Sequence, residues 1–596
     1  MIMVTPKAAL RLCSGSVLAE KALKNLKAAL TSFGSNLSPP AEMALSAVLT
    51  SMEAGLKGEL PPSFYLSAVD PGNGKSLAVA MFLRAYKASG FLPANGVLVL
   101  VSRLAEIEAY LVSAGLDRNE VAVLTSDPAT NALGAPEALH DQAPIMFTTQ
   151  QRLAARGAKS TMNALPAFFY QGAPRALRVW DESILPGEEK TVKVDDLGAL
   201  LGPLRASRKA MAASVQSTMV KAWSAPPSDV LTIPEDLGGG WGKASAHVGS
   251  AELAALAGHE ARVISFGGDV RLAGAAPTLP ADFAPAVVLD ASGRVRETYR
   301  LWESRTASLT RLPSAVNDYS DMTVHVWRHA AGKRTLADAK ARRPIVEAIV
   351  EAICNQPAEE WLIVHYKDVG TLVPEVRLKL DPEVADRVHG LTWGRHHGTN
   401  AFAHVPNIVL VGYPDYGEHG YEAVAAAAIG DGKVPELTEE ERVALREGEV
   451  AHNILQAVCR SHARAAQDGV AGACQVYLCM SPSLNLRAVL DRCFPGHQRR
   501  AWAPGASAEL GGRKGQLVRY LTDLFEASPE AVVRKGEVTE ALSLQRPALS
   551  RLLLDGAVKE ALDALWIEES RLSFQLRRPS FRPYPGGGFN VRDLLR

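Results

Sequence analysis

The chain has 596 residues, with 64 Lys and Arg against 64 Asp and Glu and 47% hydrophobic residues. This length predicts about three to five domains, and the ordinary globular composition excludes a disordered chain, a fibre and a small disulfide scaffold. A formal net charge of zero excludes coating of nucleic acid by bulk attraction, so a polyanion site would have to be a local groove.

Residues 1–60 are rich in Ala, Leu and Lys with helical apolar spacing, and Pro39–Pro40 predicts a break between two helices. From residue 61 onward, short apolar runs alternate with amphipathic stretches, a pattern typical of a parallel sheet covered by helices on both faces. In this first α/β domain, 61–300, the runs expected to form strands are 64–69, 97–101, 121–124, 145–148, 177–180 and 286–289. A mostly helical stretch at about 186–262 is expected to be an insertion.

A second α/β domain is expected over 301–490, with strands at 361–365, 408–412 and 475–479. The Pro- and Gly-containing stretch 491–512 is expected to be a linker. Three helices at 514–527, 535–543 and 546–565 and a two-stranded ribbon at 566–577 then predict a winged-helix domain over 513–585, followed by a tail over 586–596.

The strongest motif is a candidate phosphate loop that follows the first strand and precedes a helical stretch. It reads Val69-Asp70-Pro71-Gly72-Asn73-Gly74-Lys75-Ser76. Glycines at two positions allow consecutive backbone N–H groups to cradle phosphates, and the helix N-terminus adds partial positive charge. Lys75 would pair with the β- and γ-phosphates of ATP, and the Ser76 hydroxyl would bind Mg²⁺. Val69 stands where the usual motif has its first Gly.

A pair of acids follows the run 177–180, at Asp181 and Glu182. The end of a parallel strand places both carboxylates at the carboxyl edge of the sheet, next to the phosphate loop. Asp181 would hold Mg²⁺ and Glu182 would polarise the attacking water.

The phosphate loop, Asp181-Glu182-Ser183 and a second α/β lobe, in this order, resemble superfamily-2 (DEAD/DEAH-like) helicases and translocases over about residues 61–490. The other stretches that fit this family's motifs in order are Ser102-Arg103, Thr148-Thr149-Gln150-Gln151-Arg152-Leu153, Leu289-Asp290-Ala291-Ser292, Val364-His365-Tyr366-Lys367, Gly398-Thr399-Asn400, and Gln456 through Arg464. Leu289-Asp290-Ala291-Ser292 is similar to the L-D-A-T form found in DinG-type members.

The resemblance implies two RecA-like P-loop lobes in tandem that close on ATP and Mg²⁺ and move a nucleic-acid strand. It implies that Gln456 and an arginine finger reach the γ-phosphate from the second lobe. Arg460 and Arg464 are both candidates for the finger, because Cys459 replaces the family's Gly and the spacing of the arginines is one residue longer. Strand contacts are implied for Ser102, Arg103, Thr148, Thr149, Gln150, Lys367, Thr399 and Asn400.

Cysteines and histidines are the remaining candidates for metal ligands. Some DinG-type helicases carry a four-cysteine iron–sulfur cluster between the phosphate loop and the acidic pair. Residues 77–180 of this chain contain no cysteine, so no such cluster is expected. Cys459, Cys474 and Cys479 lie in or near hydrophobic segments and are expected in the core. For the histidines at 389, 396, 397 and 404, nucleic-acid or interlobe contacts are favoured over a metal, since no Cys or acid stands beside them at ligand spacing.

The C-terminal segment 535–551 has the pattern of a helix–turn–helix motif, with Arg546 and Arg551 near the exposed start of the second helix. This favours DNA binding over a purely helical interaction module. The sequence therefore predicts an ATP-dependent helicase or translocase acting on DNA, of a mobile-element replication or repair type, in the cytoplasm because no targeting or membrane segment is visible. The alternatives are an RNA helicase and an ATP-switched DNA-binding initiator or regulator that unwinds nothing.

Overall fold

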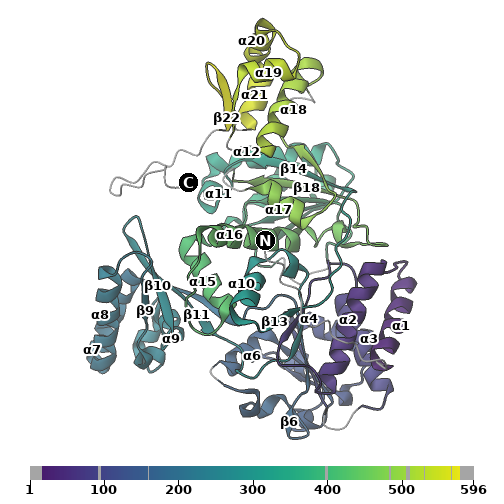
Figure 1. Ribbon diagram of the computed structural model, residues 1–596, viewed down its shortest axis with the longest axis vertical. Coiled ribbons are helices and arrows are strands. Elements are labelled where there is room, and N and C mark those ends of the chain that lie inside the picture. Colours follow the sequence, from purple (N-terminus) through teal and green to yellow (C-terminus); the bar gives the residue numbers. More distant parts are fainter. Residues whose placement is uncertain are drawn as a thin grey trace, which may run out of the picture. The chain divides into compact units, whose positions relative to one another are not determined.

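The computed structural model describes residues 17–91, 95–158, 160–395, 401–481, 485–504, 510–528, 531–565 and 567–576. These residues form two compact units (Figure 1). The first unit takes the chain up to Val316, together with Tyr416–Leu445 and Gln467–Gly469, and the second takes the rest. Both are α/β, which confirms the predicted fold class.

Two N-terminal helices, α1 (Val17–Ser32) and α2 (Pro39–Leu56), pack in the core of the first unit. The predicted break at Pro39–Pro40 is present. The Ser38 hydroxyl accepts a hydrogen bond from the Ala41 N–H at 3.4 Å, so it caps α2, and proline suits the first helical positions, where no N–H donor is needed.

The first sheet has seven strands in the order β13-β1-β12-β7-β2-β4-β3, and every neighbouring pair is parallel. Its strands are β1 (Phe64–Ser67), β2 (Val97–Val101), β3 (Val121–Leu124), β4 (Ile145–Thr149), β7 (Leu177–Asp181), β12 (Ala286–Leu289) and β13 (Leu309–Arg311). All six predicted strands are among them. The seventh, β13, lies beyond the predicted domain end at residue 300, so the first sheet extends further along the chain than predicted.

Helices cover both faces of this sheet because alternate strand residues enter two separate cores. In β2, Val97, Val99 and Val101 enter one core, and Leu98 and Leu100 enter the other. The remaining elements of this part are α3 (Lys75–Ala88), α4 (Leu104–Ala114), α5 (Pro128–Asn131), α6 (Gln150–Gly157), β5 (Phe169–Tyr170), β6 (Ala173–Pro174) and α10 (Glu297–Thr306).

The insertion is not mostly helical, as predicted, but a four-stranded antiparallel sheet with three helices. The sheet order is β8-β11-β10-β9. The elements are β8 (Gly187–Lys193), α7 (Gly198–Ser207), α8 (Lys209–Ser224), β9 (Val230–Thr232), α9 (Ser250–Ala255), β10 (Glu260–Phe266) and β11 (Asp269–Pro277). Gly267 and Gly268, both with positive φ, form the two-residue hairpin between Phe266 and Asp269, a turn that this dipeptide favours.

A segment from far along the chain, α15 (Gly417–Ile429), belongs to the first unit and packs on the insertion sheet. Its run Ala425–Ala428 is buried, and the small side chains let Ala427 approach Gly187 of β8. A buried ion pair joins the two parts: Arg262 Nε of β10 lies 3.0 Å from Glu422 Oε2, and Glu422 Oε1 accepts from Arg442 Nε at 2.9 Å.

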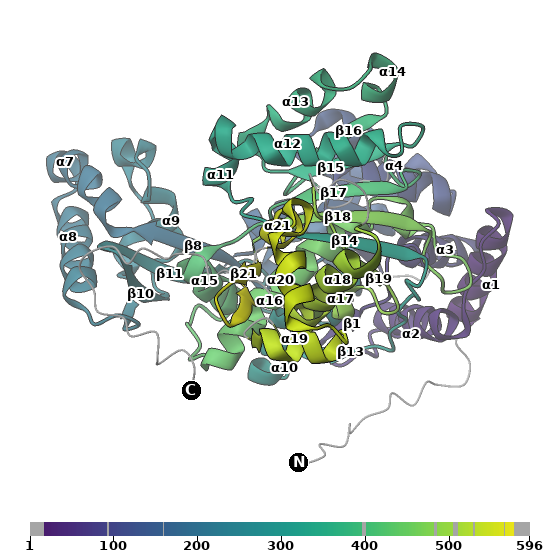
Figure 2. The same cartoon turned by 90° about the horizontal axis from the view of Figure 1, so that it is seen from above.

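The second sheet has six parallel strands in the order β16-β15-β17-β18-β14-β19 (Figure 2). Its strands are β14 (Met322–Arg328), β15 (Trp361–His365), β16 (Val388–Thr392), β17 (Asn407–Val411), β18 (Cys474–Met480) and β19 (Gln498–Ala501). The three predicted strands are present as β15, β17 and β18. The expected linker 491–512 contributes β19 to this sheet, so that part of it is not a linker.

The helices that accompany the second sheet are α11 (Lys333–Ala337), α12 (Ala339–Cys354), α13 (Leu372–Leu378), α14 (Pro382–Ala385), α16 (Glu439–Val458) and α17 (Leu486–Cys493). The first residues of α16, up to Leu445, belong to the first unit. Cys459, Cys474 and Cys479 are buried, as predicted. Within the described ranges, no helix is both long enough and apolar enough to cross a lipid bilayer.

The C-terminal part has its own small core. It runs α18 (Gly512–Ala527), β20 (Val532–Arg534), α19 (Lys535–Ala541), α20 (Arg546–Leu554), α21 (Gly556–Ala564), β21 (Ile567–Glu569) and β22 (Ser573–Leu576). The single helix predicted over 546–565 is two helices. Asp555 separates them because its carboxylate accepts from the Ala557 N–H at 3.1 Å and caps α21. The ribbon is joined by β20 in a three-stranded antiparallel sheet, in the order β20-β22-β21.

Candidate nucleotide site

The candidate phosphate loop connects β1 to the start of α3. Gly72 and Gly74 have φ values of 88° and 83°, so both adopt the left-handed conformation that glycine accepts without strain. Gly74 is the N-cap of α3, and the partial positive charge of this helix end favours an anion. The two glycines predicted to shape the loop therefore do so.

Val69, the departure from the usual motif, is fully buried in a small apolar cluster with Ala41, Ala44 and Ala315. The valine side chain therefore anchors the start of the loop in the apolar core. The Lys75 ammonium lies against the loop itself, since Nζ donates to the Val69 carbonyl at 2.5 Å and to the Asp70 carbonyl at 3.2 Å.

Ser76 and Asp181, which come from the two motifs, are in direct contact. Ser76 Oγ donates to Asp181 Oδ2 at 2.9 Å across 105 positions of sequence. The same carboxylate oxygen accepts from the hydroxyl of Tyr110 in α4 at 2.5 Å. Burial, followed by the neighbouring Glu182, raises the pKa of Asp181. A bound cation would offset the cost of burying the ionised Asp181 carboxylate. A carboxylate beside a hydroxyl is also an all-oxygen donor set of the kind that Mg²⁺ takes.

Glu182 directly follows β7, and its backbone has a φ of 82°. Its N–H donates to the Leu289 carbonyl at the end of β12, at 3.1 Å. A non-glycine residue in this region is held at an energetic cost by its surroundings. The turn places Glu182 at the carboxyl edge of the sheet beside Asp181.

Asp290 and Arg294 connect the stretch after β12 to both motifs. The buried Asp290 carboxylate accepts from the Tyr299 hydroxyl at 2.7 Å, and that hydroxyl accepts from the Ile184 N–H at 3.0 Å, just beyond the acidic pair. Arg294 Nε donates to the fully buried carboxylate of Asp70 at 2.7 Å. The phosphate loop is thus tied to the strand end that lies next to it in the sheet.

A third acid, Glu106, lies close to Asp181 and Glu182. Its carboxylate caps α4 by accepting from the Ser102 N–H at 3.0 Å and the Arg103 N–H at 3.1 Å. Burial, with a contribution from the charge of Asp181, raises the pKa of Glu106 to about 7. Ser102 and Arg103, predicted to contact nucleic acid, lie after β2 at this edge, and their backbone N–H groups are bound to Glu106.

The predicted contacts after β4 are placed differently from one another. Thr148 is fully buried and its hydroxyl donates to the Leu124 carbonyl at 2.6 Å, so it supports the sheet and offers no surface to a strand. Thr149 caps α6 through the Arg152 N–H at 3.2 Å. Gln150 Nε2 donates to the Asp181 carbonyl at 2.5 Å.

In the second unit, Gln456 and Arg460 are both buried at the end of α16 and are bonded to each other, with Arg460 Nη2 donating to Gln456 Oε1 at 2.6 Å. Arg464 lies in the short helical turn His462–Arg464 and is partly exposed. Lys367, which follows β15, is exposed. Thr399 and Asn400 lie outside the described residues.

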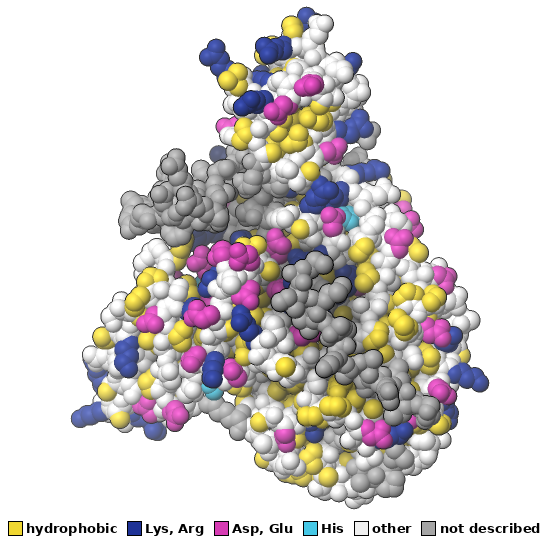
Figure 3. All heavy atoms as spheres, in the orientation of Figure 1, with side chains coloured by type: hydrophobic (Ala, Val, Ile, Leu, Met, Phe, Trp, Pro, Cys, Tyr) yellow, Lys and Arg dark blue, Asp and Glu magenta, His cyan; other side chains and the backbone are white. Residues whose placement is uncertain are grey.

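Arg546 and Arg551 of α20 are exposed. Arg551 also lines a cavity of about 470 Å³ together with Arg513, Lys514, Gln545 and Asp555, where Lys514 pairs with Asp555 at 2.6 Å. On the face shown in Figure 3, Lys and Arg side chains stand out over the C-terminal helices, with Asp and Glu side chains among them, as on the rest of this face.

Four side chains of this site were missed from the sequence: Tyr110, Glu106, Arg294 and Tyr299. Tyr110 and Glu106 lie four residues apart on α4, which follows β2, and only the sheet order β7-β2 brings that helix next to the acidic pair. For the histidines, Glu360 lies 29 positions before His389 in the sequence, so local spacing gave no sign that its carboxylate lies beside His389 and His404.

No protein-family model matches the sequence, and no curated protein matches it. Among solved structures the chain is similar to Xpd4 of S. tokodaii, with 12% identity and a TM-score of 0.43, covering 77% of this chain and 99% of that one. It is similar to S. cerevisiae Dbp5 bound to RNA and ADP BeF3, with 12% identity, a TM-score of 0.36 and coverage of 81% and 93%. It is also similar to the DUF1998 helicase MrfA bound to DNA, with 10% identity, a TM-score of 0.33 and coverage of 91% and 60%.

Proposed function

We propose that this protein is an ATP-dependent nucleic-acid helicase or translocase that acts on DNA. The observation that carries the proposal is the contact between Ser76 of the phosphate loop and Asp181 of the acidic pair, at 2.9 Å. Two motifs far apart in sequence thereby form one edge-of-sheet site with a lysine, a hydroxyl and two carboxylates, which are the groups that nucleotide hydrolysis requires.

In the proposed site, Asp70 through Ser76 surround the phosphates, and Lys75 leaves the loop carbonyls to pair with the β- and γ-phosphate oxygens. Ser76 and Asp181 would hold Mg²⁺, which when bound neutralises charge on the phosphate oxygens. Glu182 orients the attacking water and accepts its proton. Tyr110 fixes the rotamer of Asp181 by donating to the oxygen that Ser76 also contacts.

The second lobe supplies the rest of the proposed mechanism. Gln456 and one of Arg460 and Arg464 would reach the γ-phosphate, and the opening and closing that accompany turnover would move the strand. Strand contacts are proposed for the carboxyl edges of both sheets, at Arg103, Gln150 and Lys367, since phosphate contacts from side chains and backbone position a strand without reading its sequence.

DNA is proposed over RNA because of the C-terminal part. Its sequence of helix, strand, two helices, a further helix and two strands supports a winged-helix assignment, with α20 as the recognition helix and Arg546 and Arg551 on its exposed surface. Attachment to the motor would raise its effective concentration on DNA without new contacts. A role in the replication or repair of a mobile element is part of the same proposal.

A strand-displacement assay on 5′-tailed, 3′-tailed and blunt duplexes of DNA and RNA, with and without ATP, tests this function. We expect ATP-dependent displacement of a tailed DNA duplex. Displacement of RNA alone would favour the RNA helicase. ATP hydrolysis that no nucleic acid stimulates, together with DNA binding that ATP switches on or off, would favour the initiator or regulator instead.

A further inference from the structure

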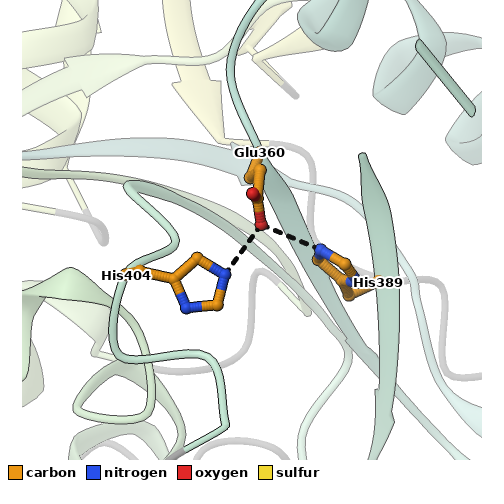
Figure 4. Close-up of side chains that lie close together, drawn as sticks. All are labelled: Glu360, His389 and His404. Atoms are coloured by element: carbon orange, nitrogen blue, oxygen red, sulfur yellow. Dashed lines mark hydrogen bonds and ion pairs between the residues drawn. The ribbon is translucent and has the colours of Figure 1, made fainter. Parts of the chain in front are cut away.

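Glu360, His389 and His404 form a compact cluster in the second unit, far in sequence from every residue of the proposed nucleotide site in the first unit. Figure 4 shows the Glu360 carboxylate between the two imidazole rings. Its Oε2 lies 3.0 Å from His389 Nε2 and 2.9 Å from His404 Nε2, and the three ligand atoms lie within 4.8 Å of one another. We propose that these three side chains bind a divalent transition-metal ion of the Zn²⁺ class.

The three ligands come from three segments at the amino ends of neighbouring strands. Glu360 directly precedes β15, His389 is the second residue of β16 and is paired with Leu362 of β15, and His404 precedes β17. Lys367, by contrast, follows the carboxyl end of β15. The cluster is therefore at the opposite edge of this sheet from the proposed strand contacts.

Two of the three separations between ligand atoms require little adjustment to admit a metal ion. Tetrahedral Zn²⁺ with bonds of about 2.0–2.1 Å to nitrogen and oxygen separates its ligand atoms by about 3.3 Å. The two separations from Glu360 Oε2, 3.0 and 2.9 Å, need to widen by only about 0.3–0.4 Å. Rotation of exposed side chains supplies this, since 60% of the His404 side chain and 38% of the Glu360 side chain are accessible. Accessibility also leaves the fourth position open to water.

The donor chemistry selects the class of metal. Two imidazole nitrogens and one carboxylate oxygen suit Zn²⁺ and its first-row neighbours, whereas Mg²⁺ and Ca²⁺ prefer sets made of oxygen alone. Two further contacts position the ligand residues: the Asn407 side chain donates to the Glu360 carbonyl at 3.3 Å, and the Phe402 ring lies 5.5 Å from the His389 ring.

A bound ion would fasten the segment before β17 to the ends of β15 and β16, and would stabilise this edge of the sheet by mass action. The site is independent of nucleotide, so its failure and the failure of the proposed helicase function are separate results.

The test is calorimetric titration of the full chain with ZnCl₂, without nucleotide, for wild type, Glu360→Gln, His404→Gln and the control His247→Gln. His247 is an exposed histidine of the insertion, so the control makes the same chemical change away from the cluster. We expect one Zn²⁺ per wild-type and control chain, at least about tenfold weaker binding by the other two variants, and unchanged Zn²⁺ affinity when MgCl₂ is present in excess. Titration with Co²⁺ should give visible absorption bands for wild type and the control. These bands should be lost in Glu360→Gln and His404→Gln.

Wild-type chain that takes up no Zn²⁺, or His404→Gln that binds it as tightly as wild type, would overturn the proposal and leave a histidine–carboxylate hydrogen-bond cluster. Because His404 is exposed, its substitution keeps the test valid even where Glu360→Gln disturbs folding, and circular dichroism of each metal-free variant checks this.

Discussion

Substitution of Glu106 by Gln should change how the stability of the first unit depends on pH. The folded state raises the pKa of Glu106 from 4.5 to about 7, which corresponds to about 3 kcal/mol at about 1.4 kcal/mol per pKa unit. Because the folded pKa is the higher one, the folded state is favoured below the unfolded pKa of 4.5, and this advantage is lost as the pH rises through about 7. Glutamine does not ionise, so the variant lacks this loss.

The assay is urea unfolding of wild type and Glu106→Gln at about pH 5 and about pH 8, with EDTA present to exclude cations. The difference in unfolding free energy between the two proteins should shift by about 2.5 kcal/mol in favour of the variant at the higher pH. Glu537→Gln is the matched control, since Glu537 caps α19 through the Arg534 N–H at 3.2 Å but is exposed. An equal pH dependence for wild type and Glu106→Gln would refute the burial of this carboxyl beside the acidic pair.

Three further substitutions test contacts of the first unit. Arg294→Ala leaves the buried Asp70 carboxylate without its cation and should cost about 3–5 kcal/mol in unfolding free energy, measured by urea unfolding; a loss below about 1 kcal/mol would contradict the buried pair. Glu422→Ala should destabilise by a similar amount through Arg262 and speed proteolysis of the insertion, and unchanged proteolysis would contradict the packing of α15 there. Tyr110→Phe should lower ATP turnover by about tenfold, as expected for loss of one hydrogen bond to a charged group; wild-type turnover would remove Tyr110 from the site.

Six strands of the first parallel sheet, and β15, β17 and β18 of the second, could be predicted from the sequence because they are short, mostly apolar runs between helical stretches. The other strands, β13, β14, β16 and β19, are short or carry polar residues, and they were not predicted. Runs such as Val97–Val101 and Trp361–His365 are buried on both faces, which makes their signal continuous and hard to mistake. The contact between the phosphate loop and the acidic pair was predictable for a related reason. Parallel strands bring their carboxyl ends to one edge, so two polar motifs at strand ends must lie there.

The insertion was misread because its strands are half exposed and carry charges. Gly187–Lys193, for example, has five polar or charged residues in seven. Such strands lack a continuous apolar run, and only the Gly267-Gly268 hairpin signal marks them. Contacts between segments far apart in the sequence could not be predicted either, such as α15 on the insertion sheet and Glu360 beside His404. Local sequence patterns do not determine the order of strands in a sheet, and that order decides which distant segments meet.

Nucleic-acid-stimulated ATP hydrolysis by wild type and Lys75→Ala tests the central claim most directly. Lys87→Ala is the control, since Lys87 lies on the same helix and binds Asp117 at the surface. We predict that wild type and the control hydrolyse ATP faster when single-stranded DNA is added, and that Lys75→Ala has no turnover. Full turnover by Lys75→Ala would contradict the proposed role of the loop between β1 and α3 in hydrolysis.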